Sequence, residues 1–318
     1  MYSIAGRAAA TAATNHHAIA TLWNPSGGTA ITVYTVGISM TTGSGGLSSI
    51  FRASARGTPG STVTPDLDND YSRKATPPST AVLDLAAYTV QPTFDTNEII
   101  QLNAENQIGG GAVIQLPVPI VVPPGTGLNI QQTNSSSNVC DVWFEFDEGS
   151  TTDNAFYLTS AIDPLAAGES VMGALWNPSS TRAIRLFFMK FNNRGAEAAT
   201  FDFQYEIRRT TAEGTLSGTN FTAAIENHVS RAEAGIGVKA DTSFSTEPTI
   251  DASPLFRHYL SGRARIGGFT WTVPKDDDNG IDMDDCIVIP PGSGIACVLT
   301  TAAAAALLAK DMTFGWFE

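Results

Sequence analysis

Apolar and polar residues alternate along most of this 318-residue chain, in short runs separated by clusters of Gly, Pro, Ser, Thr and Asp. Tyr34, Val36 and Ile38 show the period of two that turns one face of a β-strand toward a core. The segment 56–80 is rich in turn-forming residues, and we expect it to be a loop over one end of the fold. In the first half of the chain the pattern predicts a short segment at 2–4 and strands at 18–23, 29–40, 47–53, 81–90, 97–103, 112–122, 127–131 and 138–146.

Two short motifs of the first half return in the second half. The motif Leu-Trp-Asn-Pro-Ser at 22–26 is repeated letter for letter at 175–179. The motif Val-Pro-Pro-Gly-Thr-Gly-Leu at 122–128 corresponds to Ile-Pro-Pro-Gly-Ser-Gly-Ile at 289–295. Proline fixes its own φ and favours an extended residue before it, so both motifs are typical of strands joined by turns. Their recurrence predicts that the chain carries one fold twice.

The strand pattern predicts an all-β fold of two tandem jelly-roll-like antiparallel β-sandwiches, which arise from an internal duplication. A polar segment sets the boundary, and we expect one domain at 1–149 and a second at 150–318. Each is large enough to bury roughly 68–70% of its unfolded surface. The second copy departs from the first at an acidic insertion, 275–285, and at 301–310, where alanine and leucine favour a short helical turn.

The chain is acidic, with a formal net charge of −13 at pH 7 and a sequence pI near 4.6. This charge argues against a nucleic-acid partner, because nucleic-acid binding requires a basic face. Only 15% of the residues are charged. A surface with so few charges favours contacts with other proteins, and it is equally typical of a Ser- and Thr-rich β protein.

Cysteine content and hydropathy give no sign of a secreted or membrane-bound chain. The three cysteines, Cys140, Cys286 and Cys297, have no metal-binding spacing and form an odd set, so we expect reduced, buried thiols. No run approaches 18 apolar residues, and the N-terminal segment lacks the apolar centre of a signal peptide. We therefore expect a soluble protein made in a cytoplasm, with no membrane partner.

The sequence contains none of the common enzyme motifs, such as a Gly-x-Ser-x-Gly elbow, a P-loop or a His-Glu-x-x-His helix. We expect a non-enzymatic protein without a cofactor or a metal. Two acidic clusters, at 66–70 and 276–285, approach the spacing of a calcium loop but lack its turn glycine or its end ligands. Solvated loops are the preferred interpretation, and a calcium site built from several loops stays open as the alternative.

The repeat accounts for four of the five tryptophans. Trp23 and Trp176 hold the same place in the repeated motif, and Trp143 and Trp316 both fall in the last predicted strand of their half. We expect these four side chains in the cores of the two domains, with Trp23 and Trp176 equivalent and buried. Trp271 has no counterpart, so it is the tryptophan best suited to a binding surface.

The Leu-Trp-Asn-Pro-Ser and Pro-Pro-Gly-x-Gly motifs, each leading into a strand in both halves, resemble those of the β-sandwich structural proteins of tailed bacteriophage virions. Such proteins serve as head decoration, head fibre and tail adhesin proteins. The resemblance implies a multi-copy virion component with a jelly-roll or TNF-like sandwich in each half. The acidic insertion and the absence of a coiled-coil segment depart from this pattern and argue against a long fibre.

Within this class the leading hypothesis is a capsid decoration, or cement, protein that binds the outer surface of the major capsid protein lattice. The alternatives are a tail-located receptor-binding or adaptor protein, a double jelly-roll capsid protein, and a secreted carbohydrate-active enzyme. The sparse charge also predicts a homo-oligomer, most simply a trimer, with one domain docked on the particle. The candidate interface residues, chosen where the two halves differ, are Lys275, Asp276, Asp277, Asp278, Asp282, Asp284, Asp285, Trp271, Leu307 and Leu308.

Overall fold

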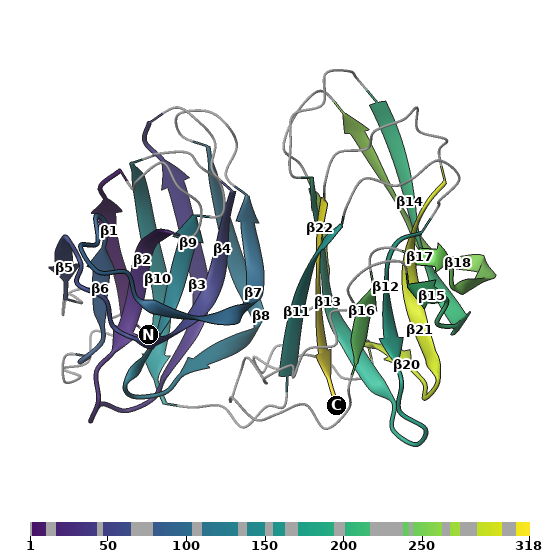
Figure 1. Ribbon diagram of the computed structural model, residues 1–318, viewed down its shortest axis with the longest axis horizontal. Coiled ribbons are helices and arrows are strands. Elements are labelled where there is room, and N and C mark those ends of the chain that lie inside the picture. The colour runs from purple at the N-terminus through teal and green to yellow at the C-terminus, as the bar shows by residue number, and fades with distance from the viewer. Residues whose placement is uncertain are drawn as a thin grey trace. The chain divides into compact units, whose positions relative to one another are not determined.

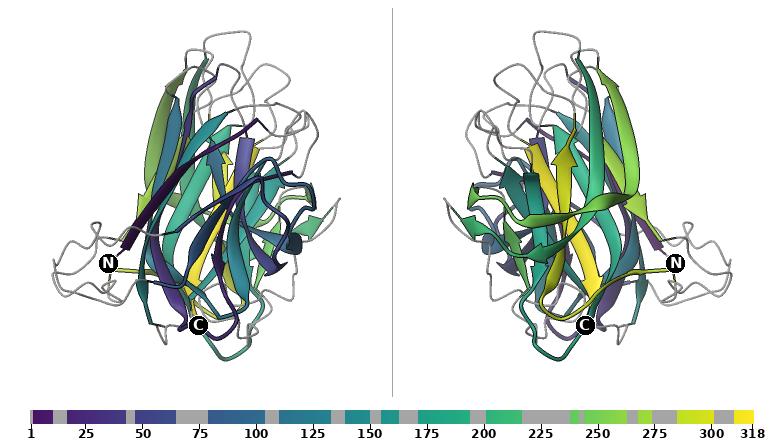
Figure 2. Two further views of the ribbon diagram at one scale, coloured as in Figure 1. Left: turned by 90° about the vertical axis from the view of Figure 1, so that its left-hand side faces the viewer. Right: turned by 90° about the vertical axis from the view of Figure 1, so that its right-hand side faces the viewer.

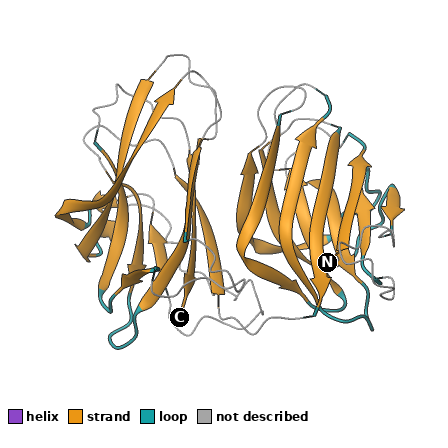
Figure 3. Ribbon diagram, turned by 180° about the vertical axis from the view of Figure 1, so that it is seen from behind, coloured by secondary structure: helices purple, strands orange, loops and turns teal. Residues whose placement is uncertain are grey.

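The structure is a computed structural model, in which all described elements are β-strands and none is a helix (Figure 3). The all-β prediction is therefore confirmed. The chain forms two compact units, unit 1 with Met1–Asp153 and unit 2 with Asn154–Asn227 and Arg231–Glu318 (Figure 1). The described residues are 2–10, 17–42, 47–64, 79–103, 110–132, 139–149, 155–162, 171–193, 201–216, 238–241, 244–262, 268–273, 285–300 and 310–318.

Unit 1 consists of two antiparallel sheets, with strand orders β1-β10-β3-β8 and β5-β6-β2-β9-β4-β7. Successive long strands alternate between the two sheets except for β4 and β7, which pair within one sheet, and this is the strand order of a jelly roll. The strands are β1 (Tyr2–Ala8), β2 (His17–Asn24), β3 (Ile31–Met40), β4 (Leu47–Ala55), β5 (Ser61–Val63), β6 (Val82–Leu85), β7 (Thr93–Asn103), β8 (Gly111–Val122), β9 (Thr126–Gln132) and β10 (Cys140–Glu148).

Unit 2 has the same order of long strands. Its two large sheets are β11-β22-β13-β19, with β20 also paired to β13, and β16-β12-β21-β14-β18, and β15 and β17 form a separate two-stranded sheet. Figure 2 shows the yellow C-terminal strands between teal and green strands that precede them in the chain. The common origin of the units by duplication stays a prediction. The strands are β11 (Ala155–Ile162), β12 (Val171–Asn177), β13 (Ile184–Asn193), β14 (Phe201–Ala212), β15 (Thr215–Leu216), β16 (Lys239–Asp241), β17 (Phe244–Thr246), β18 (Thr249–Gly262), β19 (Gly268–Thr272), β20 (Ile287–Ile289), β21 (Ser293–Leu299) and β22 (Lys310–Phe317).

The predicted strands of unit 1 agree with the observed ones to within a few residues, with two differences. The predicted strand at 81–90 ends at Leu85, because the chain turns there to form a bridge between Thr58 and Val90. The expected loop at 56–80 contains β5, which pairs with β6. Both differences involve short pairings, an isolated bridge and a three-residue edge strand, for which local sequence gives little periodic signal. The helical turn expected at 301–310 lies almost wholly outside the described residues.

Each core lies between the two sheets of its unit. In β10 the alternate residues Val142, Phe144 and Phe146 are fully buried, as the period of two requires. In unit 2 one hydrophobic cluster joins residues of both sheets, including Leu175 from β12 and Trp316 from β22. Burial of these apolar side chains is the main stabilising contribution to each unit.

The repeated Asn-Pro and Pro-Pro-Gly motifs meet in space and tie the two sheets of each unit together. In unit 1, Asn24 at the end of β2 donates from Nδ2 to the carbonyl oxygens of Thr29 and Val122, both at 2.9 Å. Val122 ends β8, which belongs to the opposite sheet. Gly125 adopts a φ of 77°, which favours glycine, and its N–H donates to the Asn24 carbonyl at 2.8 Å. The motif is therefore a structural brace.

Unit 2 contains the same brace. Asn177 Nδ2 donates to the carbonyl oxygens of Arg182 at 2.9 Å and Ile289 at 3.1 Å, with a further contact to Pro290 at 3.2 Å. Gly292, with a φ of 61°, donates its N–H to the Asn177 carbonyl at 3.1 Å. In both units the asparagine is completely buried. A buried amide that satisfies backbone carbonyls of a second sheet fixes how the two sheets meet.

Two further pairs of side chains at equivalent positions make the same contacts in both units. Arg52 in β4 donates from Nη1 to the Val121 carbonyl at 2.7 Å, and Arg209 in β14 does the same to the Val288 carbonyl at 2.8 Å. At the other end of β2 and β12, side-chain oxygens accept from the backbone. Gln91 accepts from Ala18 N and Glu247 from Val171 N, both at 2.8 Å. The equivalence of the units thus extends from strand order to individual hydrogen bonds.

Candidate functional site

Most of the interface residues expected from the sequence fall in parts of the chain that the structure does not describe. Asp285 is the exception among the acidic residues, and it is exposed in a turn before β20. Its neighbour Cys286 is buried. The acidic cluster at 66–70 also lies outside the described residues. The same applies to Lys275, Asp276, Asp277, Asp278, Asp282, Asp284, Leu307 and Leu308.

Trp271, the tryptophan proposed for a binding surface, contacts the core of unit 2. It lies in β19, is partly exposed, and stacks on Phe256 of β18 with ring centroids 5.9 Å apart and an interplanar angle of 21°. Both rings pack against the hydrophobic cluster that joins the two sheets. The aromatic contact of Trp271 is therefore an internal one, which closes one side of the core.

The core assignment of the other tryptophans needs correction. Trp23 and Trp316 are buried, with 8% and 0% of their surface exposed, as predicted. Trp176 was also expected to be buried, but it is partly exposed to solvent, although it holds the same motif position as Trp23. Trp143 was expected in the core and instead lies on the outer face of its sheet, partly exposed. It is one residue out of phase with Val142, which faces the core, so the period of two places it outside.

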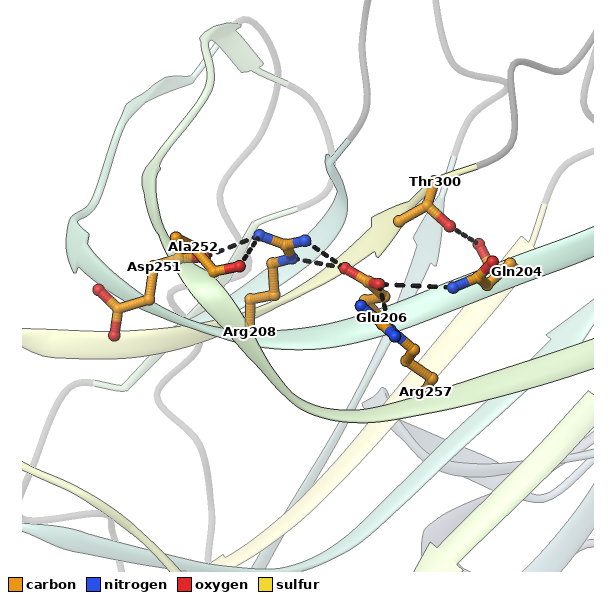
Figure 4. Close-up of polar contacts among 7 residues, drawn as sticks. All are labelled: Gln204, Glu206, Arg208, Asp251, Ala252, Arg257 and Thr300. Atoms are coloured by element: carbon orange, nitrogen blue, oxygen red, sulfur yellow. Dashed lines mark hydrogen bonds and ion pairs between the residues drawn. The ribbon is translucent and has the colours of Figure 1, made fainter.

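A charged cluster occupies the outer face of the β16-β12-β21-β14-β18 sheet in unit 2, centred on Glu206 of β14 (Figure 4). Arg208 donates from Nε to Glu206 Oε2 at 2.7 Å and also from Nη2 to the same oxygen. Arg257 of β18 donates from Nε to Glu206 Oε1 at 2.6 Å. Gln204 approaches the same oxygen at 3.4 Å. The carboxylate therefore has hydrogen bonds on both oxygens.

The two arginines of this cluster differ in their surroundings. Arg208 is mostly buried, and its Nη1 donates to the carbonyl oxygens of Asp251 at 2.9 Å and Ala252 at 2.8 Å, which ties β14 to β18. The Arg257 side chain is 54% exposed, and within the described residues it has no second partner. Glu206 neutralises one of the two positive charges. The cluster thus presents one net positive charge to solvent, at Arg257.

Electrostatics keep Glu206 ionised. Burial by itself raises the pKa of the Glu206 carboxyl, but the hydrogen bonds and charges of Arg208 and Arg257 outweigh it, so the pKa lies below its ordinary value. A carboxylate held by two guanidinium groups is a poor general base, because protonation would break both pairs. The arrangement is suited to fixing the position of Arg257 rather than to proton transfer.

Among the described residues of unit 1 the charged cluster has no counterpart. Glu206 pairs with Val298 of β21 and Arg257 of β18, whereas the equivalent Ser49 of unit 1 pairs with Gln131 of β9 and Gln101 of β7. The sequence signal was the Glu-Ile-Arg alternation at 206–208, which places both charges on one strand face. It was missed because the partner on β18 lies about fifty residues away, and only strand pairing brings it close.

In the part of the chain that the structure describes, no three His, Cys, Asp or Glu side chains are grouped to hold a metal ion. That part also contains no helix with the length and hydropathy needed to cross a membrane. No protein-family model matches the chain, and a comparison with curated proteins gives no match either.

Proposed function

We propose that this chain is a non-enzymatic structural protein of a phage virion, and specifically a capsid decoration protein that binds the outer surface of the major capsid protein lattice. The observation that carries the proposal is the presence of two successive units with one jelly-roll strand order in a single chain. Jelly rolls are a recurrent building unit of viral capsid proteins. The step from this fold to a virion is an analogy of architecture, which the resemblance of the motifs supports.

The contacts of the repeated motifs favour a structural role. Asn24 and Asn177, the residues that carry the resemblance, are buried and hold two sheets together. Their repetition therefore reflects the requirements of the fold. A function on the particle would then depend on the outer faces of the sheets, and these are the places where the two units differ. Unit 2 has the charged cluster with Arg257, and unit 1 has uncharged side chains at the same positions.

The proposal assigns the particle contact to unit 2. Arg257 offers exposed N–H donors on a side chain whose position Glu206 fixes, so little conformational entropy is lost when a partner carboxylate binds. Arginine is enriched at the centres of protein interfaces for this reason. A homo-oligomer, most simply a trimer, would repeat this contact around a symmetry axis of the capsid. Neither nucleic acid nor a membrane has a part in the proposal.

The experiment is to compare phage particles made with and without the gene, and to count copies of the chain per particle by quantitative mass spectrometry. A decoration protein is expected in hundreds of copies, and particles without it still form a closed shell. A small multiple of three or six copies would instead identify a tail protein. A shell that does not close without the chain would identify a capsid protein, and either result contradicts the proposal.

Adding purified protein back to particles that lack it tests the contact itself. The Arg257→Glu variant is expected to bind the particles at least about tenfold more weakly, because the change places two negative charges side by side. Arg7→Glu is the matched control, since Arg7 is also an exposed arginine paired with a carboxylate, Asp141, but lies in unit 1. Equal binding by the wild type and both variants would exclude the unit 2 contact.

A further inference from the structure

The outer face of the β1-β10-β3-β8 sheet in unit 1 has an ordered arrangement of side chains in three rows. Strand pairing aligns Ala5, Trp143, Gly37 and Val113 across the four strands as the central row. The flanking rows lie two residues away on every strand and so face the same side. They consist of Ser3, Glu145, Thr35 and Gln115 on one side and of Arg7, Asp141, Ser39 and Gly111 on the other.

The central row is apolar, and Trp143 is its largest side chain. A Cβ atom added to Gly37 would lie 2.0 Å from Trp143 Cε2 and 2.1 Å from Cζ2, so the indole ring rests directly on this glycine. Any other residue at position 37 would push the ring away. On the far side of Gly37, Val113 is 58% exposed, and Ala5 is exposed beside Trp143. The result is an open apolar strip with an aromatic ring held against the sheet.

The flanking rows supply planar polar groups. Arg7 and Asp141 form a two-point pair, with Nε to Oδ1 at 2.7 Å and Nη2 to Oδ2 at 2.9 Å. Their side chains are 66% and 41% exposed. Gln115 is exposed at the other side of the strip, and Glu145 is partly exposed. Carboxylate, amide and guanidinium groups therefore border the aromatic ring on both sides, with donors and acceptors available to a ligand.

The size of the arrangement decides between a large and a small ligand. Strands are about 4.8 Å apart and rise about 3.4 Å per residue, so the twelve Cα positions cover an area of only about 14 Å by 14 Å. One partner of a standard protein interface contributes about 800 Å². The strip and its borders reach about a quarter of that area, which is small for one whole side of a protein interface and suits a ligand of one or two rings.

We propose that this face is a carbohydrate-binding site, in which Trp143 stacks against the C–H face of a pyranose ring. The face of an indole ring carries a negative electrostatic potential and attracts polarised C–H groups. The contact also removes the apolar surfaces of the indole and of the sugar from water. The equatorial hydroxyl groups of the same sugar project outward around the periphery of the ring. There Glu145 and Asp141 can accept hydrogen bonds, and Gln115 can both donate and accept.

The described residues of unit 2 do not form a corresponding site. At the position of Gly37 and Trp143, strand pairing places Lys190 opposite Thr313, and both residues are buried, with 9% and 0% of their surface exposed. The carbohydrate site is thus a property of unit 1, whereas the particle contact proposed above belongs to unit 2. The inference does not depend on the location of the chain in a virion.

The test is a titration of the full chain with soluble oligosaccharides of glucose, galactose, mannose and N-acetylglucosamine, each up to its solubility limit. Binding is followed through the indole N–H signal of Trp143 in NMR spectra. At least one sugar is expected to shift this signal in a saturable manner. The Trp143→Ala variant should lose at least about tenfold in affinity, because the aromatic contact and the apolar burial are both removed. Trp143→Phe should retain part of the binding.

Two variants separate a binding role from a folding role. Glu145→Gln leaves the tryptophan in place and should weaken binding through the loss of a charged acceptor. Trp176→Phe alters a partly exposed tryptophan of unit 2 and should bind as the wild type does. Circular dichroism checks the fold of each variant. If Trp143→Ala unfolds, Glu145→Gln still decides the question.

Three outcomes would overturn the proposal. The first is a Trp143 signal that no sugar of the panel shifts. The second is binding by Trp143→Ala with wild-type affinity. The third is a Trp143→Ala variant that loses self-association or attachment to particles while the wild type binds no sugar, since this result would identify the face as a protein interface.

Discussion

Replacement of Asn24 or Asn177 by alanine is expected to destabilise one unit at a time. The change at Asn24 removes the Nδ2 donor from two carbonyl oxygens, that of Val122 in a buried contact and that of Thr29 in a partly buried one. Each such hydrogen bond contributes about 0.5–1.5 kcal/mol, so the expected loss in the free energy of unfolding is about 2 kcal/mol. The change at Asn177 should cost about 3 kcal/mol, because its Oδ1 also accepts from Ser179 N at 3.1 Å. Asn24 Oδ1 has no partner within the described residues.

These values correspond to measurable shifts in melting temperature. For a unit of about 150 residues, 1 kcal/mol lowers Tm by about 2–4 °C, so Asn24→Ala should lower it by about 4–8 °C and Asn177→Ala by about 6–12 °C. Calorimetry gives the shift, and hydrogen exchange identifies the unit that opens. Asn24→Ala should increase exchange in β2 and β9, and Asn177→Ala in β12 and β21.

Two controls accompany this pair. Ser26→Ala alters an exposed residue of the same turn and should leave Tm unchanged. Asn24→Asp keeps the shape of the side chain but sets a carboxylate against two carbonyl oxygens, so it should destabilise more than alanine does. If Asn24→Ala melts as the wild type does, or if it increases exchange in the strands of unit 2, the brace does not act as described.

Three other predictions concern burial and charge. The pKa of the Glu206 carboxyl is lowered in the folded protein, so the ionised side chain stabilises the fold. This contribution to the free energy of unfolding is complete above the ordinary Glu pKa of about 4.3, and it is lost as the pH falls through the lower pKa of the folded state. Urea midpoints between about pH 3 and pH 7 should show that Glu206→Gln removes this acid-dependent part, and an unchanged profile would contradict it. Burial raises the pKa of the Cys140 thiol to about 12, so a thiol reagent should leave Cys140 unmodified until the protein unfolds. Trp23→Ala should cost about 3–5 kcal/mol in a denaturation experiment, and Trp176→Ala should cost less because that ring is partly exposed; equal losses would refute the difference.

The sequence was sufficient to predict most of the strands and turns of unit 1. Period-two alternation located β3 and β8 to within two residues, because one buried face imposes this pattern whatever the fold around it. The Asn-Pro and Pro-Pro-Gly motifs predicted turns correctly, since proline and glycine act through their own backbone. The burial expected for the three cysteines is confirmed, and none of them forms a disulfide. Local patterns therefore carried most of the secondary structure.

Contacts between distant strands could not be predicted in this way. Nothing near Asn24 in the sequence shows that its amide reaches Val122, and nothing near Glu206 indicates Arg257. The error at Trp143 has a different cause. Its place in the last strand was predicted correctly, but its phase relative to Val142 was not used, and in a strand a shift of one residue decides between core and surface. Applying the phase would have found the outer face of this sheet from the sequence.

The brace also determines when each unit can form during synthesis. The partners Asn24 and Val122 are 98 residues apart, and Asn177 and Ile289 are 112 residues apart. The first strand, β1, pairs with the last strand of its unit, β10. Folds dominated by such distant pairings form slowly, in milliseconds to seconds. A long loop must first close, at a cost in conformational entropy, before the stabilising contacts can form. On the ribosome, β1 therefore waits for nearly all of unit 1 to be translated, and unit 1 can close before translation of unit 2 is complete.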